Sequence, residues 1–204
     1  QDLVIKVAEH DTGEEVSLLG STDMHLLRKC PCPVWIDRPG MKSAYRKIRA
    51  AVDPFDDESG NLQRLILDLA ISLAGREHAS LEVIHTWELA GESMLTHGRA
   101  RIPHIELELL RQAMESRHRQ ALDELLKPYS LNTGDDNIHL VKGKAAESIY
   151  RLTKHKDIDL IVMGTLGRAG ISGLFIGNTA ENVLRETHTA VLTVKPDGFI
   201  TPVQ

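Results

Sequence analysis

Five glycines lie close together in the stretch MGTLGRAGISGLFIGNTAENVL, which covers residues 163–184, at positions 164, 167, 170, 173 and 177. The stretch follows the apolar run IDLIV, which indicates a buried strand, and continues into TAENVLRE, which is typical of a helix start. Glycine reaches backbone conformations with positive φ and lets a ligand come close to the main chain. Successive backbone N–H groups, followed by the positive end of a helix dipole, attract an anion. The stretch therefore predicts a phosphate-binding loop.

Side chains near the loop suit the same chemistry. Asn178 is placed to cap the following helix, with Glu181 three residues later in an approximate capping box. Arg168 offers a charge-assisted contact to a phosphate. The alternative is a flexible strand-to-helix connection without a ligand. The loop has no lysine and is not a Walker A motif, and it does not match G-x-G-x-x-G.

Predicted strands and helices alternate from residue 46 onward. We expect strands at 47–53, 79–89, 137–143, 158–164 and 189–196, and helices at 61–77, 104–127, 144–157 and about 178–186, with a polar loop at 90–103. This alternation predicts an α/β fold with an open, doubly wound parallel sheet. Ligands of such sheets bind beyond the carboxyl ends of the strands, where both Asp53 and the glycine loop fall.

The chain also contains an internal repeat of domain size. A shift of 157 residues places residues 2–39 on residues 159–196 without a gap, and nine residues of the first copy meet identical ones: Asp2, Leu3, Gly13, Gly20, Thr22, Leu27, Arg28, Val34 and Pro39. We therefore expect residues 1–39 to be the carboxyl-terminal part of a first domain, from its fourth to its fifth strand. Residues 40–45 would be a linker, 46–196 a complete second domain and 197–204 a tail. The natural protein would then be a tandem of two similar domains.

The two copies differ in the loop. Gly164 corresponds to Val7 and Gly167 to His10, whereas Gly170 and Gly177 keep their glycines as Gly13 and Gly20. The first copy carries four acidic residues in this region, and the second copy carries Arg168 and no acid: the acids are Glu9, Asp11, Glu14 and Glu15. The comparison favours an anion site in the second copy alone.

Composition excludes some classes of protein. The net charge of −5 and the pI near 6.1 argue against a nucleic-acid binder, which usually carries a basic patch. No apolar run is long enough to span a bilayer, so no membrane insertion is expected, and no secretory signal is found. The only two cysteines, in CPCP at residues 30–33, are too few for a disulfide scaffold and fit a reducing compartment, so we expect a cytoplasmic protein. A metal site using His25 or His10 with these cysteines matches no common zinc spacing, and metal binding by the ten histidines stays open.

The spacing Gly164-x2-Gly167-x9-Gly177 resembles the universal stress protein family, whose nucleotide-binding branch carries G-x2-G-x9-G-[ST]. The resemblance covers about residues 43–196, with residues 1–39 as a partial second domain, and includes Asp53, DLIVMGTLGR, GNTAENVL and a last strand ending in VKP. The tandem arrangement and the tail KPDGFITPV look like the two-domain E-type branch of Gram-negative bacteria. Asn178 stands where the motif has Ser or Thr, so the match to a phosphate-binding motif is incomplete at this position. Thr179 is the next residue.

The resemblance implies a Rossmann-like five-stranded sheet of order 3-2-1-4-5 that binds ATP, with or without Mg²⁺. Asp53 and Pro54 would lie near the adenosine, with Asp53 near the ribose or a metal, and the backbone from Val83 to His85 would meet the base. Six residues would line the phosphates, with Arg168 beside them: Met163, Gly164, Gly167, Gly177, Asn178 and Thr179. The alternatives without a ligand are a turn for Asp53, a solvated strand-end position for His85 and a core position for Met163.

The resemblance further implies a stress-response regulatory protein whose conformation or assembly responds to the nucleotide. We assign no catalytic residue, because the sequence offers no P-loop lysine and no evident base, so any ATP hydrolysis should be slow. The alternatives are a binder of a nucleotide sugar or an amphiphile, with the segment 90–103 covering the ligand, and a ligand-free dimerisation scaffold. In the family, fifth strands often pair, so we expect Val34–Asp37 and Val191–Val194 at an interface within the tandem or in a homodimer.

Overall fold

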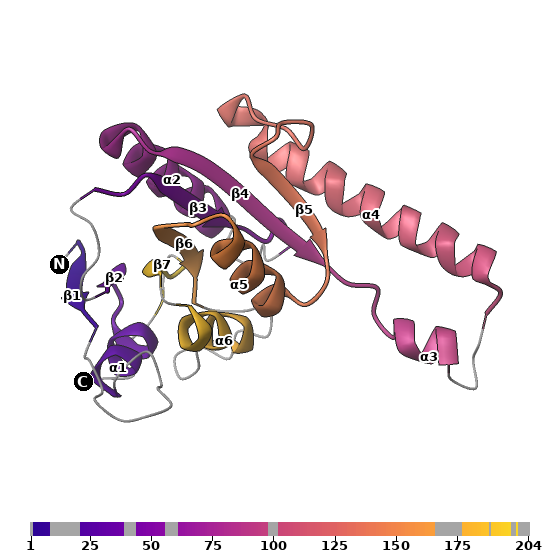
Figure 1. Ribbon diagram of the computed structural model, residues 1–204, viewed down its shortest axis with the longest axis horizontal. Helices are drawn as coiled ribbons and strands as arrows, with labels where there is room; N and C mark the ends of the chain where they lie inside the picture. Colours follow the sequence, from indigo (N-terminus) through magenta and orange to yellow (C-terminus); the bar gives the residue numbers. More distant parts are fainter. Residues whose placement is uncertain are drawn as a thin grey trace.

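One mixed sheet with helices on both faces forms the body of the protein (Figure 1). The computed structural model describes residues 2–8, 21–38, 44–55, 61–97, 102–165, 177–187, 189–196 and 199. The predicted α/β class is confirmed. The predicted count of five strands is wrong for the sheet as a whole, which has seven strands in the order β1-β2-β7-β6-β3-β4-β5.

The carboxyl-terminal part of the chain supplies five parallel strands. Its elements are β3 (Lys47–Ala51), α2 (Leu62–Glu77), β4 (Ser80–Trp87), α3 (Glu92–His97), α4 (His104–Leu126), the 3₁₀ turn η1 (Lys127–Tyr129), β5 (Ile138–Lys142), α5 (Ala145–His155), β6 (Leu160–Gly164), α6 (Asn178–Glu186) and β7 (Ala190–Val194). Counted along this part alone, the strands follow the expected order 3-2-1-4-5, and each neighbouring pair is parallel. The sheet has more strands than expected because residues 2–38 extend it beyond β7.

Residues 2–38 repeat the last part of this unit. They form β1 (Val4–Val7), α1 (Ser21–Lys29) and β2 (Val34–Asp37), and a shift of 157 residues carries α1 onto α6 residue for residue. The strand registers agree as well, since Val4 pairs with Val34 and Ile161 pairs with Val191. The repeat seen in the sequence is therefore a repeat of structure.

The two copies meet where β2 pairs with β7 in the antiparallel direction. Trp35 lies opposite Leu192, its own counterpart in the repeat. On either side, Val34 pairs with the counterpart of Ile36, and Ile36 pairs with the counterpart of Val34. The pairing therefore follows a local pseudo-two-fold axis at Trp35 and Leu192, like the isologous interface of a symmetric dimer. The expected pairing of fifth strands is thus present inside one chain, and each of these strands has a neighbour on both edges.

Two reciprocal cations reinforce this seam. The Arg38 guanidinium donates to the carbonyl of Thr187 at the end of α6, with a distance of 2.7 Å between Nη2 and O. Its counterpart Lys195 donates from Nζ to the carbonyl of Cys30 at the end of α1, at 2.6 Å. Cationic groups are favourable at helix carboxyl ends, where carbonyls lack helical partners. Each copy therefore caps a helix of the other.

Apolar side chains form one core on each face of the sheet. Helices α2 and α4 cover one face, where Leu67, Leu122 and Leu126 are fully buried. Helices α1, α5 and α6 cover the other, with Leu27 and Leu184 fully buried. Among the described residues, no helix is long and apolar enough to cross a membrane.

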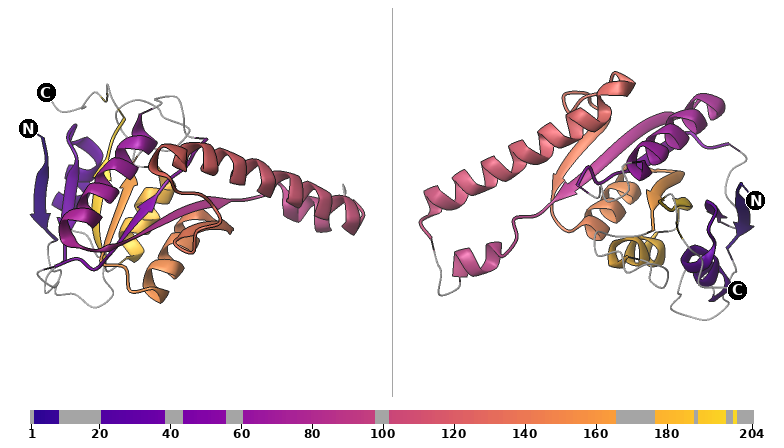
Figure 2. Two further views of the ribbon diagram at one scale, coloured as in Figure 1. Left: turned by 90° about the horizontal axis from the view of Figure 1, so that it is seen from above. Right: turned by 180° about the vertical axis from the view of Figure 1, so that it is seen from behind.

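Residues 92–97 form the short helix α3, although the sequence predicted a polar loop there. Arg111 on α4 holds α3 through an ion pair with Glu92. Figures 1 and 2 show α3 and the first half of α4 extending away from the sheet. The prediction failed because six residues are too few to establish a helical period.

A charged network lies beneath α5. The Arg49 side chain on β3 is fully buried and pairs with Glu82 on β4, while its Nη1 donates to the hydroxyl of Thr153 at 3.2 Å. Burial alone would raise the pKa of Glu82, but the hydrogen bond and charge of Arg49, with the charges of Lys156 and His139, lower it. Removing one partner of such a pair leaves the other charge buried and uncompensated, which destabilises the folded state.

We predict that Ile36→Ala lowers the free energy of unfolding by about 2–4 kcal/mol, because Ile36 is 1% exposed at the seam. The matched control Ile5→Ala, at a side chain that is 66% exposed on β1, should change it by less than about 0.5 kcal/mol. Urea unfolding of both variants measures the difference. If the two variants changed the free energy of unfolding equally, residues 2–38 would not unfold together with the rest of the chain.

We also predict that Arg49→Met costs about 3–5 kcal/mol near neutral pH, because Glu82 is left buried without its main partner. The lowered pKa of Glu82 means that the pairing stabilises the native state above about pH 4.5 and is lost as the pH falls through the native value. The gap between parent and variant should therefore narrow in acid, as urea midpoints at several pH values would show. A double variant with Glu82→Gln should recover part of the loss; no recovery would contradict this account.

Candidate functional site

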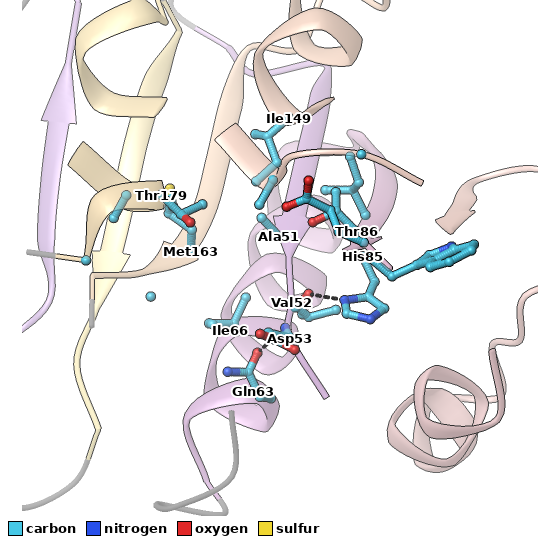
Figure 3. Close-up of a pocket in the computed structure, with 18 of the residues that line it drawn as sticks. Ala51, Val52, Asp53, Gln63, Ile66, His85, Thr86, Ile149, Met163 and Thr179 are labelled. Atoms are coloured by element: carbon cyan, nitrogen blue, oxygen red, sulfur yellow. Dashed lines mark hydrogen bonds between the residues drawn. The ribbon is translucent and has the colours of Figure 1, made fainter. Parts of the chain in front are cut away.

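The carboxyl ends of β3, β4, β5 and β6 and the start of α6 surround one pocket (Figure 3). Its volume is about 410 Å³, within the usual range for small-molecule sites of about 300–1,000 Å³. The residues that line it are Ala51, Val52, Asp53, Gln63, Ile66, Ile84, His85, Thr86, Trp87, Glu88, His118, Gly143, Ala145, Ile149, Met163, Gly164, Gly177, Asn178, Thr179 and Ala180. The pocket has the position expected for a ligand of a doubly wound sheet.

Asp53 is fixed where β3 ends. Its backbone N–H donates to Oε1 of Gln63 on α2 at 2.8 Å, and its Oδ1 accepts from the N–H of Phe55 at 3.2 Å. The second contact is a side-chain turn of the kind that Asp commonly forms. The turn that the sequence analysis offered as an alternative to a binding role is therefore present. The turn does not exclude a binding role, because Asp53 also lines the pocket.

Two histidines close the side of the pocket near α4. His85 is 1% exposed, so its interpretation as a solvated strand-end residue is wrong. Its Nδ1 lies 3.1 Å from the carbonyl of Val52, which can only accept, so Nδ1 carries the proton. In the neutral pair, His85 Nε2 then accepts from Nδ1–H of His118, at 2.7 Å. The His118 ring packs between Phe55 and Trp87, with ring centroids 4.6 and 6.0 Å away.

The start of α6 presents backbone donors to the pocket. The N–H of Gly177 is bonded to the carbonyl of Thr165 at 2.8 Å, and the first helical bond runs from the N–H of Glu181 to the carbonyl of Gly177. The N–H groups of residues 178–180 therefore precede the helical ladder, at the positive end of the dipole. All three of these residues line the pocket.

The predicted capping box is wrong. The N-cap residue is Gly177, with φ −60° and ψ 143°, and Asn178 is the first residue of the helix. The Glu181 carboxylate instead pairs with Arg28 of α1 and Arg185 of α6. Because the backbone of Gly177 is extended, its angles alone do not require glycine.

Gly164 has a packing role that the sequence comparison did not anticipate. A Cβ at this position would lie 3.2 Å from Cδ2 of Leu62, at the start of α2. Its counterpart Val7 is 56% exposed, so β1 has room for a side chain at this position. The difference between Gly164 and Val7 is therefore explained by the close approach of α2, and it is no longer evidence for a ligand by itself.

Most of the predicted site residues that the structure describes come together. Seven of them line the pocket: Asp53, His85, Met163, Gly164, Gly177, Asn178 and Thr179. Val83 does not, because it is fully buried in the core on the face that α2 covers. Pro54 follows Asp53 and is not among the lining residues. Gly167 and Arg168 lie outside the described residues.

Sequence reasoning missed part of the pocket. His118 and Gln63 come from helices whose local pattern gives no sign of a site. Gly143 had a signal, because it is a glycine directly after a predicted strand. It has φ +143°, and its N–H donates to the carbonyl of Trp87 at 2.9 Å, which joins the ends of β4 and β5.

The described part of the chain holds no group of three or more His, Cys, Asp and Glu residues arranged to bind a metal ion. Asp53 is the carboxylate in the pocket nearest the start of α2, and a single carboxylate suits Mg²⁺ that is carried mainly by substrate phosphates. Asp53 is thus a residue that could contribute one carboxylate ligand to such an ion.

Comparisons with known proteins agree on one family. The model of the universal stress protein family matches residues 44–195. Universal stress protein E of Escherichia coli K12 is 31% identical over 209 residues, which cover all of this chain and 63% of that protein. A crystal structure of a universal stress protein from Pseudomonas aeruginosa has a TM-score of 0.76 at 32% identity, over 97% of this chain and 64% of that one. Universal stress protein A homolog 1 of Coxiella burnetii is 31% identical over 74% of this chain and 96% of its own length.

The packing role of Gly164 leads to a double-mutant prediction. Gly164→Val should cost about 1–3 kcal/mol by crowding Leu62, and Leu62→Ala should cost about 2–5 kcal/mol by leaving a cavity. The valine side chain would fill space that Leu62→Ala leaves empty. The double variant should therefore lose less free energy of unfolding than the two single variants together, as chemical unfolding would show. Additive effects would contradict the contact. Gly75→Ala, where a Cβ meets nothing within 4 Å in α2, serves as the neutral or mildly stabilising control.

Proposed function

Because the chain belongs to the universal stress protein family, we propose that its pocket binds ATP or a related nucleotide and that the protein acts as a nucleotide-responsive regulator of the stress response. The observation that carries the proposal is the start of α6. Three backbone N–H groups there precede the helical ladder and face a cavity large enough for a small molecule. The phosphates would bind at this end of the pocket.

The other end of the pocket suits a nucleoside. Aromatic and apolar surface from Trp87, Ile84 and Ile149 can pack against a base. The Asp53 carboxylate, held by its turn with Phe55, can accept hydrogen bonds from ribose hydroxyls. Polar groups at two ends of the pocket would fix the direction in which a ligand binds.

The larger assembly also belongs to the proposal. The chain spans less than two thirds of the length of the E-type relatives that it matches over its full length. We infer a natural tandem of two domains, in which residues 1–39 belong to the first and 46–196 to the second, and a cytoplasmic location. The seam between β2 and β7 would be the contact through which a nucleotide-dependent change in one domain reaches the other.

Three other functions can be distinguished from that of a nucleotide-binding regulator. A binder of a nucleotide sugar or an amphiphile would use the same pocket, and Met94 and Ile105 at α3 and α4 are 68% and 67% exposed. A ligand-free scaffold would leave the pocket empty. An ATPase would need Mg²⁺-dependent phosphate release, for which no general base is assigned.

The test is calorimetric titration of ATP with Mg²⁺ into the parent and into Thr179→Glu. The substitution places a carboxylate at the second residue of α6, where a negative charge is favourable for the helix but repels a phosphate. We expect the affinity for ATP to fall tenfold or more, about 1.4 kcal/mol, while the affinity for adenosine changes little. The matched control is Thr22→Glu, at the corresponding position of α1, and it should bind ATP like the parent.

Absence of ATP and ADP binding by the folded parent would refute the proposal and favour the scaffold. Equal weakening by both Glu variants would show that the start of α6 is not the phosphate site. Phosphate release measured in the same samples separates a regulator from an enzyme.

A further inference from the structure

Two cysteine thiols lie side by side where α1 passes into β2. The Sγ atoms of Cys30 and Cys32 are 3.2 Å apart, and both cysteines are free thiols. Cys30 is the carboxyl cap of α1, since its N–H donates to the carbonyl of Leu26 at 2.9 Å. The chain bends at Pro31 and Cys32, and Pro31 and Pro33 restrict the backbone on both sides.

The fold does not need these thiols. In the second copy the corresponding turn, from α6 into β7, carries Thr187 and Thr189 in place of Cys30 and Cys32. That turn has the same cap, with the N–H of Thr187 bonded to the carbonyl of Val183. Threonine therefore supports the same helix cap, so the cap does not explain why the first copy carries two thiols.

A buried cation stands next to the pair. Lys195 is 6% exposed, and its Nζ donates to the carbonyls of Leu27 and Cys30, at 3.0 and 2.6 Å. Burial lowers the pKa of Lys195 to about 8, while the negative charges of the Cys30 and Cys32 thiolates oppose that change. The amine is thus still largely protonated at neutral pH, and a nearby cation stabilises a thiolate.

The two thiols differ in environment. Cys30 is half-buried, whereas Cys32 is 9% exposed. Burial and the hydrogen bond with Cys30 raise the pKa of the Cys32 thiol. Cys30 is therefore the accessible, attacking thiol, and Cys32 is placed to attack its sulfur afterwards.

We propose that Cys30 and Cys32 form a reversible dithiol–disulfide redox site that exchanges with low-molecular-weight disulfides of the glutathione type, with Lys195 stabilising the attacking thiolate. The Cys30 thiolate attacks one sulfur of the incoming disulfide, which releases one thiolate and leaves a mixed disulfide on Cys30. Cys32 loses its proton, attacks the Cys30 sulfur and releases the second thiolate. The two cysteines give up two electrons and two protons, which leave with the two thiols released.

The small ring that a Cys30–Cys32 disulfide closes makes the disulfide easy to reduce. A bridge between residues two positions apart has little freedom to reach relaxed disulfide geometry, and strained disulfides are the readily reduced ones. The site therefore follows the redox state of the surrounding thiol pool, and it is adjacent to the Lys195 contact that joins the two copies.

The experiment equilibrates the folded chain with oxidised glutathione, blocks free thiols by alkylation and measures intact mass and tryptic peptides. Residues 30–42 form one tryptic peptide that holds both cysteines, the only two in the chain. We expect a monomer that has lost two hydrogens and cannot be alkylated, and that regains both thiols with dithiothreitol. Thiols that remain fully alkylatable, or only intermolecular dimers, would overturn the proposal.

Variants separate the two steps and the role of the cation. Cys32→Ser should stop at a stable glutathione adduct on Cys30, and the double variant Cys30→Thr, Cys32→Thr should fold like the parent without reacting. Lys195→Met should slow loss of thiols near neutral pH by about threefold or more. Its matched control is Arg38→Met, which removes the reciprocal cation at Thr187 and should leave the thiol rate unchanged. Equal rates in the Lys195 variant and the parent would remove Lys195 from the proposal.

Discussion

The antiparallel pairing of β2 with β7 is the interaction on which the rest of the structure depends. The described residues of this part, 2–8 and 21–38, form two short strands and one helix, too little to bury a core alone. Through this pairing they join a sheet whose other five strands form a complete unit, and Leu27 and Ile36 become part of a shared core. The pseudo-two-fold geometry at Trp35 and Leu192 lets one set of contacts serve in both directions.

The pocket depends on the same sheet in another way. Parallel strands end at a common edge, so Asp53, His85, Gly143 and Met163 meet although they are far apart in the chain. Helix α4 then completes the wall by bringing His118 against His85. The start of α6 thus lies across the pocket from a wall of mixed apolar and polar side chains.

Much of the fold could be predicted because its signals are local or repetitive. The shift of 157 residues anticipated β1, α1 and β2, and strand ends pointed to Asp53 and Met163. What failed depends on tertiary contact. Nothing in the sequence of α4 marks His118, whose role comes from packing on Phe55 and Trp87. The capping box failed because Gly177 takes the N-cap position and the Glu181 carboxylate pairs with Arg28 and Arg185.

The exposed strand β1 has a consequence for the sheet. It is the outermost strand of the described sheet, and Ile5 and Val7 on it are 66% and 56% exposed, as is 41% of Leu3 just before it. Such an edge is a template for pairing with another chain unless charges protect it. Its lysine, Lys6, is engaged by Asp23 at 2.5 Å and offers little protection as a gatekeeper. Within this chain, β1 is therefore an edge at which a further strand can be added to the sheet.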